Sequence, residues 1–229
     1  MNMQNKLKTR GILMLIGFAA VLAIIFSPVF PEKMNGLDFM DNLFNMVSKG
    51  SSYFIPAALE DSEQYAGKII DVTITMKDEK EAAATSGLLQ KSGVAVSTTG
   101  SQLRVRGDMS TILKNSLADS DLMFANNSDA VQQKYGFGAE LALFTWWKSF
   151  HAIGAALNKQ KKFIEAKPFA TIRKKALEPA YNYYGVTPMN WQDNIGLIIA
   201  ALAFYVAYTL WYGFGIMFLF EGFGLKIGH

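Results

Sequence analysis

The longest uncharged stretch of the chain, Asn194 to Phe220, constrains the fold more than any other feature. It exceeds the run of about 20 apolar residues that crosses the roughly 30 Å hydrocarbon core of a bilayer as a helix. It also carries small residues four positions apart, a spacing that lets two membrane helices approach closely: Gly196, Ala200, Ala203 and Ala207. We therefore predict a membrane-spanning helix that packs against other protein through these four residues.

A second uncharged stretch, Gly11 to Pro31, follows the basic residues Lys6, Lys8 and Arg10. Basic residues before an apolar segment are also typical of a secretory signal peptide. However, the residues after the apolar core, 27–31, lack the small-x-small pattern that a signal peptidase needs. We therefore expect the segment to be retained as a first membrane helix.

These two segments predict an α+β membrane protein, in which two transmembrane helices flank a small α/β domain accompanied by amphipathic helices. The expected boundaries are 1–10 for a cytoplasmic N-terminus, 11–31 for the first span, 32–67 for amphipathic helices, 68–127 for the α/β domain, 128–193 for a long amphipathic basic helix and an aromatic juxtamembrane segment, 194–220 for the second span and 221–229 for a short tail.

Basic residues flank the two spans unevenly. Lys6, Lys8 and Arg10 precede the first span and Lys226 follows the second, whereas Lys33 is the one basic residue close to either span on the loop side. Because basic flanks stay in the cytoplasm, this asymmetry predicts cytoplasmic termini and an extracytoplasmic loop domain. The expected location is the inner membrane of a bacterium.

The α/β domain is predicted from a change of periodicity. Apolar residues at every second position from Ile70 to Met76 indicate a half-buried strand. Asp78 is expected to cap a helix over 79–92, followed by a hairpin whose loop spans 97–101 and by a helix over about 108–124. The order β-α-β-β-α predicts a small two-layer unit. Residues 36–67, before it, predict two short amphipathic helices.

A long helix is predicted over residues 138–177, where apolar residues first recur at helical spacing and basic residues then accumulate. Pro168 is expected to kink or divide this helix, since proline cannot donate to the preceding turn. Five basic residues are candidate contacts with a partner or with lipid: Lys161, Lys162, Arg173, Lys174 and Lys175. Their ligand would be an acidic surface or phosphate headgroups, and a solvated helix face is the alternative.

No pattern in the sequence points to catalysis. The chain has no cysteine and two histidines, which leaves few ligands for a metal or a haem. Walker, dinucleotide-binding, HExxH and nucleophile-elbow motifs are absent from the sequence, and a net charge of +3 is too small to indicate nucleic acid. We expect no enzyme activity, no cofactor and no metal, and we expect His151 to be a core or interface histidine. Glycines cluster at Gly213 and Gly215 and at Gly222 and Gly224, in or beside the second span, where they favour close helix packing.

Taken together, these features predict a non-catalytic accessory or structural subunit of a larger integral membrane complex, with other membrane subunits and lipid as partners. The alternative is a self-assembling homo-oligomeric scaffold. Two spans around an α/β domain and a long helix resemble the topology of the polysaccharide co-polymerases of bacterial envelopes, and that resemblance implies a ring of identical chains. The proline- and glycine-rich signature that those proteins carry around their second span is absent from this sequence.

Overall fold

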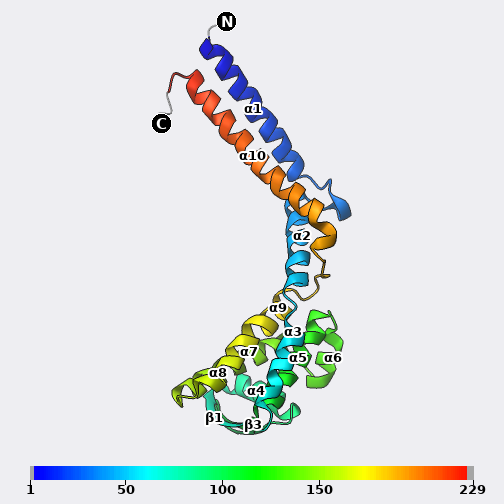
Figure 1. The fold of residues 1–229 in the computed structure, drawn as a ribbon, viewed down its shortest axis with the longest axis vertical. Helices are drawn as coiled ribbons and strands as arrows, with labels where there is room; N and C mark the ends of the chain where they lie inside the picture. Colours follow the sequence, from blue (N-terminus) through cyan, green and yellow to red (C-terminus); the bar gives the residue numbers. More distant parts are fainter. Residues whose placement is uncertain (1–2, 226–229) are drawn as a thin grey trace. The chain divides into compact units, whose positions relative to one another are not determined.

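The computed structural model describes residues 3–225, so Lys226, which entered the prediction of orientation, lies outside the described residues. The chain is mostly helical with a small three-stranded antiparallel sheet (Figure 1). It divides into two compact units. Unit 1 combines residues 1–48 with 188–229, and unit 2 comprises residues 49–187. The compact unit that holds the sheet is therefore larger than the α/β domain expected over 68–127.

Unit 1 is built around two apolar helices, α1 (Met3–Ile25) and α10 (Ile195–Gly222), which lie side by side (Figure 1). By length and composition both could cross a membrane. The first helix ends before the expected limit of Pro31. A 3-10 turn, η1 (Pro31–Lys33), starts at that proline, because a first helical position needs no N–H donor. Another 3-10 turn, η4 (Gln192–Asn194), precedes α10.

The two short helices predicted for residues 36–67 are present. α2 (Gly36–Ser51) contains the boundary between the units, and the side chain of Asn35 caps its first turn by accepting from the Asp38 N–H at 2.9 Å. α3 (Ile55–Ser62) carries Pro56 in its first turn, where proline is favoured, and continues into the 3-10 turn η2 (Glu63–Tyr65).

The sheet of unit 2 has the strand order β1-β3-β2, with β1 at Ile69–Thr75, β2 at Ala95–Thr99 and β3 at Gln102–Asp108. The crossover helix α4 (Glu79–Lys91) begins at Asp78, whose carboxylate accepts from the Glu81 N–H at 2.8 Å as predicted. The alternation predicted for β1 is confirmed, since Ile70, Val72 and Ile74 are all buried. The hairpin loop is tighter than the expected 97–101, because both strands continue to a turn at Gly100 and Ser101.

Further helices cover the sheet and form one core with it. α5 (Met109–Phe124) and α6 (Ser128–Tyr135) are followed by α7 (Ala139–Lys159), α8 (Phe163–Ile172), a π-helical turn η3 (Arg173–Leu177) and α9 (Glu178–Asn182). The largest fully buried apolar side chains of unit 2 come from α5, α7 and α8 and from the elements before them, α3, β1, α4 and β3: Ile55, Ile70, Leu88, Leu89, Leu103, Met109, Ile112, Leu113, Trp146, Phe150 and Phe169.

The long helix predicted over 138–177 is divided in the structure, but the division does not fall at Pro168. The break falls at residues 160–162, where Lys161 adopts a left-handed conformation with φ of 60°, and Pro168 lies buried inside α8. The reason is tertiary. Leu157 at the end of α7 and Phe169 in α8 are both fully buried in the same core, so the chain has to reverse between them.

Candidate interaction surfaces

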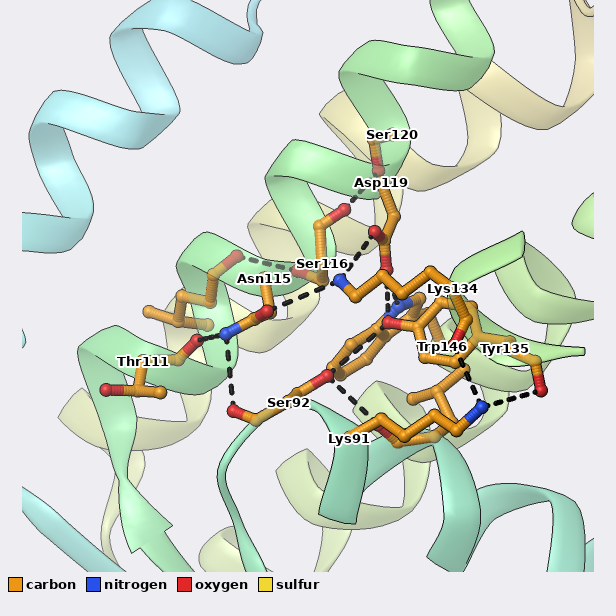
Figure 2. A network of polar contacts seen from close by, with 12 residues as sticks. Lys91, Ser92, Thr111, Asn115, Ser116, Asp119, Ser120, Lys134, Tyr135 and Trp146 are labelled. Atoms are coloured by element: carbon orange, nitrogen blue, oxygen red, sulfur yellow. Dashed lines mark hydrogen bonds and ion pairs between the residues drawn. The ribbon is translucent and has the colours of Figure 1, made fainter. Parts of the chain in front are cut away.

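A buried carboxylate, Asp119 of α5, joins the helices of unit 2 (Figure 2). Its Oδ2 accepts hydrogen bonds from the Tyr135 hydroxyl at 2.5 Å and from Trp146 Nε1 at 2.8 Å. Its Oδ1 accepts from Lys134 Nζ at 2.8 Å, which also balances its charge. Burial, and then the charge of Asp119, raises the pKa of the Tyr135 hydroxyl. Since donors occupy both carboxylate oxygens, this network is a structural one.

The outer part of the same network fixes the end of α4 against α6 (Figure 2). Lys91 Nζ donates to the carbonyl oxygens of Lys134 at 2.9 Å and Tyr135 at 3.1 Å, at the C-terminus of α6. A cation is favoured there because the last carbonyls of a helix lack intrahelical donors. Asn115 Nδ2 donates to the Ser92 carbonyl at 3.3 Å, which adds α5 to the same contact.

A buried lysine, Lys49, fixes the chain at the other end of unit 2. Its Nζ donates to Asn126 Oδ1 at 2.9 Å and to the Val186 carbonyl at 2.6 Å, and it lies 5.1 Å from the centre of the Phe124 ring. Burial lowers the pKa of Lys49. Asn126 also accepts from the Gly185 N–H and donates to the Val186 carbonyl, so this contact ties the ends of unit 2 together.

An exposed row of stacked rings runs along α7. Phe144 stacks on Trp147 with centroids 6.1 Å apart, and Trp147 stacks on His151 at the same separation. Tyr181 of α9 lies beside Phe144, at 6.5 Å between centroids. We call Phe144, Trp147, His151 and Tyr181 the aromatic surface. Its outer side chains are exposed, so His151 is a surface residue and does not belong to the core.

Several polar groups beside the aromatic surface have partners within unit 2, whereas the buried Arg173 Nε makes no hydrogen bond and lies 4.0 Å from Glu178 Oε1. Trp147 Nε1 donates to Glu178 Oε1 at 2.8 Å, and Arg173 Nη1 donates to His151 Nδ1 at 2.5 Å. Because arginine cannot accept, this contact places the proton of a neutral His151 ring on Nε2. The Arg173 guanidinium also lies 5.0 Å from the Trp147 ring centre. A cavity of about 260 Å³ opens between Leu143, Phe144, Trp147, Leu177, Glu178, Tyr181 and Asn182.

The structure divides the five predicted contact residues between two places. Lys161 and Lys162 are exposed in the turn between α7 and α8, whereas Lys174 and Lys175 are exposed on the π-helical turn η3. Arg173 is largely occupied by its contacts with His151 and Trp147. The π-helical turn starts at Arg173, and such turns are frequent at functional sites.

In unit 1, glycines bring α1 and α10 into close contact. A Cβ atom on Gly11 would lie 2.6 Å from the backbone N of Leu219, and one on Gly222 would lie 2.6 Å from the backbone N of Lys8. The expectation of close packing is thereby confirmed for Gly222 and for Gly215, whose Cβ would lie 3.0 Å from the Leu15 side chain, but not for Gly213, whose Cβ would meet nothing within 4 Å. Gly11, on the facing helix, was missed, because a single glycine in an apolar run gives no pattern by itself.

Two aromatic side chains add hydrogen bonds across this helix pair. The Tyr208 hydroxyl donates to the Phe18 carbonyl, and Trp211 Nε1 donates to the Met14 carbonyl, both at 2.9 Å. The predicted packing residues Gly196, Ala200, Ala203 and Ala207 are exposed on α10. Contact with α1 therefore uses the face of Gly215 and Gly222, and leaves those four residues uncovered.

The aromatic residues of the predicted juxtamembrane segment are divided between the units. Trp191 lies in unit 1, whereas Tyr181, Tyr183 and Tyr184 lie in unit 2. The Tyr184 hydroxyl donates to Ser128 Oγ at 2.8 Å, which packs this tyrosine on its own unit. Trp191 and Tyr181 are both exposed.

No family model, no curated protein and no solved structure matches this chain. Within residues 3–225, no group of three histidine, aspartate or glutamate side chains is placed to hold a metal ion. The class of protein is thus defined by its own architecture, a largely helical unit with a small antiparallel sheet and a pair of apolar helices packed through glycine.

Proposed function

We propose that this chain is a non-catalytic accessory subunit of an integral membrane complex, anchored by α1 and α10 and bound to a partner protein through the aromatic surface of unit 2. The main support for the proposal is that the aromatic side chains of this surface are exposed and already held in position. Its rings are stacked in advance, Trp147 Nε1 donates to Glu178, and the Arg173 guanidinium lies over the Trp147 ring. Such a rigid, exposed aromatic surface loses little conformational entropy when a partner covers it.

The partner is expected to be a protein. The cavity beside Trp147 holds about 260 Å³, which is below the roughly 300–1,000 Å³ of sites for drug-sized ligands. Aromatic residues, which make up this surface, are enriched in the centre of protein interfaces. Lys174 and Lys175 are exposed on the turn that contributes Arg173. We therefore expect an apolar segment flanked by carboxylates on another membrane subunit.

The uncovered side of α10 supports a second contact, inside the membrane. Helices in lipid associate through close packing of small residues, since apolar surface gains little by leaving lipid. Replacing Ala200 and Ala203 with leucine should leave insertion and the contact with α1 intact, because neither residue faces α1. Native gels should then show a weakened complex, and full retention of the complex would assign this face to lipid.

The orientation remains part of the proposal, with cytoplasmic termini and unit 2 outside the cytoplasm of a bacterial cell. The chain has no cysteine, so single introduced cysteines report without interference. A cysteine at Ser101 should react with an impermeant thiol reagent in intact cells, whereas one at Thr9 should not. The reverse pattern would contradict the orientation.

Native mass spectrometry of the full chain extracted from membranes tests the proposed contact. The variant Phe144→Ser/Tyr181→Ser should lose a partner subunit that the unsubstituted chain retains. The matched control is Ile69→Ser, which removes an even more exposed apolar side chain from β1 and should retain the partner. Loss of the partner in both variants, or in neither, would contradict a contact through the aromatic surface. Complexes that contain only copies of this chain would instead favour the homo-oligomeric scaffold.

A further inference from the structure

We propose that the turn between α7 and α8 is a lipid-binding tip, which inserts Phe163 and Ile164 into the interface of an anionic bilayer while neighbouring lysines bind phosphate headgroups. We define the tip as Lys159, Lys161, Lys162, Phe163 and Ile164. It is separate from the aromatic surface, and the inference does not depend on the proposed accessory role.

The two apolar side chains of the tip are unusually exposed. Phe163 is 63% and Ile164 is 73% exposed, the largest fractions among the large apolar side chains that are exposed in unit 2. They are also adjacent in the sequence, so they form one apolar projection. Burying a side chain of this kind is worth about 1.5–3 kcal/mol. Water is therefore an unfavourable environment for this part of the chain.

The tip is held firmly by the fold. Lys161 takes the left-handed conformation, and the Lys162 N–H donates to the Leu157 carbonyl at 2.9 Å, which closes the end of α7. Gln160 Nε2 donates to the Asp71 carbonyl on β1 at 3.1 Å. Phe169, one turn further along α8, is fully buried. Phe163 and Ile164, the first two residues of α8, therefore directly follow a turn that these contacts hold in place.

The exposed charged side chains around the tip are mainly positive. Lys159, Lys161, Lys162 and Lys167 are all exposed. The nearby carboxylate of Asp71 is already paired with Arg104 at 2.8 Å, and the pKa of Asp71 is lowered first by that hydrogen bond and then by neighbouring cations that include Lys162.

The acidic residue in the first turn of α8, Glu165, lies towards another part of unit 2. Burial, followed by the charges of Asp61 and Glu165, raises the pKa of the Tyr65 hydroxyl. Residues 159–167 carry four lysines and one acidic residue, so this segment keeps a net positive charge that suits phosphate.

Lipid fits this surface better than an acidic protein does. A stable protein interface needs roughly 800 Å² from each partner, with a continuous apolar centre. The tip offers only two apolar side chains, surrounded by lysines whose long stems can reach headgroups at different depths. That combination is typical of interfacial insertion into anionic bilayers. A bilayer is also expected nearby, since α1 and α10 are apolar enough to cross one.

The test uses the full chain with one introduced cysteine, Asn158→Cys, labelled with an environment-sensitive dye. Asn158 is exposed and next to the tip, and the chain has no other cysteine. In one arm the protein is reconstituted in phosphatidylcholine vesicles that carry a lipid-borne quencher, with or without phosphatidylglycerol, and quenching of the dye is measured. In the other arm, protein in phosphatidylcholine nanodiscs meets added vesicles of either composition. We expect the dye to be quenched, or the added vesicles to be bound, only when phosphatidylglycerol is present, in at least one of the two arms.

Matched variants separate the tip from general charge. Lys161→Gln/Lys162→Gln should weaken binding at least about tenfold, since each lysine near an anionic surface contributes about 1 kcal/mol. Phe163→Ser/Ile164→Ser should weaken it by a similar factor with the charge unchanged. Lys174→Gln/Lys175→Gln removes the same charge elsewhere and should change binding less than about twofold. Near-ultraviolet circular dichroism checks that each variant is folded.

Three results would overturn the proposal. The first is the absence of any dependence on phosphatidylglycerol in both arms. The second is an equal loss of binding in the Lys174→Gln/Lys175→Gln control, which would assign the effect to net charge. The third is binding of polyglutamate as tight as that of the vesicles and unaffected by Phe163→Ser/Ile164→Ser, which would make the tip a site for acidic polypeptides.

Discussion

Unit 1 and unit 2 are each held together internally by a different kind of contact. In unit 1 the closest contacts join two backbones at Gly11 and Gly222, and large apolar side chains point outward along both helices. In unit 2 the apolar side chains point inward, and a charged group at the centre, Asp119, is surrounded by donors. The helix contact in unit 1 should therefore depend on close packing at a few glycines. The stability of unit 2 should depend on the burial of apolar side chains and on hydrogen bonds to its buried polar groups.

The largest effect is expected from Asp119→Ala in unit 2. This change removes the shared acceptor of the Tyr135 hydroxyl, Trp146 Nε1 and the Lys134 ammonium group. Lys134 keeps Asn115 Oδ1 at 3.3 Å and the Tyr135 hydroxyl keeps Ser92 Oγ at 3.4 Å, both longer contacts. Removing one partner of a buried charged pair costs about 3–5 kcal/mol. Urea denaturation of the full chain in neutral detergent, followed by near-ultraviolet circular dichroism, measures the loss of unfolding free energy.

Asp121→Ala is the matched control for this prediction. Asp121 lies two residues further along α5, is only half-buried, and accepts from the Tyr53 hydroxyl at 2.6 Å. Its loss should cost about 1 kcal/mol, as for an ordinary hydrogen bond. Equal effects of the two substitutions would show that the network around Asp119 contributes nothing special to unit 2.

The next largest effect concerns Gly11→Leu in unit 1. Its Cβ would lie 2.6 Å from Leu219 N and 2.9 Å from the Gly215 carbonyl oxygen, and a backbone cannot move aside as a flexible side chain can. Overpacking of this kind costs about 1–3 kcal/mol or more. The contact can be followed by disulfide formation between Met14→Cys and Gly215→Cys, because a Cβ on Gly215 would lie 3.5 Å from that of Met14.

Gly196→Leu provides the control in the same helix pair. A Cβ there meets nothing within 4 Å, so the disulfide should form as in the parent double-cysteine protein. If Gly11→Leu also formed the disulfide at the parent rate, close backbone contact would not be what holds α1 against α10.

A smaller effect is expected at alkaline pH. The pKa of the Tyr135 hydroxyl is raised above 10.0, so the folded chain keeps a proton that the unfolded chain loses. This contribution to stability is complete below pH 10 and decreases as the pH rises above it. Tyr135→Phe should lower the unfolding free energy by about 1 kcal/mol below pH 10 and flatten its alkaline decline.

Denaturation at several pH values above 10 measures that decline. Tyr53 serves for comparison, because its hydrogen bond to Asp121, followed by burial, raises its pKa to about 12. Tyr53→Phe should therefore remove a separate part of the decline between pH 10 and 12. An unchanged profile in Tyr135→Phe would show that its hydroxyl ionises normally in the folded chain.

The smallest effect is expected from Lys49→Met. Asn126 Oδ1 keeps the Gly185 N–H as a donor, and the Val186 carbonyl keeps Asn126 Nδ2, so neither acceptor is left alone. The unfolding free energy should change by less than about 1 kcal/mol. Asn126→Ala should cost more, because Asn126 has φ of 61° and makes several of these bonds. A larger loss in Lys49→Met would show that a buried positive charge itself stabilises unit 2.

Short-range sequence patterns were sufficient to predict several elements of the fold. The apolar runs in α1 and α10, the alternation in β1 and the Asp78 cap of α4 follow from periodicity and composition, which act over a few residues. The end of α7 could not be predicted in this way. It is set by the burial of Leu157 and Phe169 in one core, although the proline that sequence rules favour as a break lies inside α8.

The same distinction applies to the candidate surfaces. Sequence alone identified the five basic residues and the small residues of α10, and it favoured Gly215 and Gly222 for close packing. Only the tertiary structure separated Lys161 and Lys162 from Lys174 and Lys175, added Phe163 and Ile164 to the tip, and matched Gly11 with α10. The physical reason is that exposure and close approach are properties of pairs of elements distant in the chain, whereas helix and strand periodicity is already present within a single element.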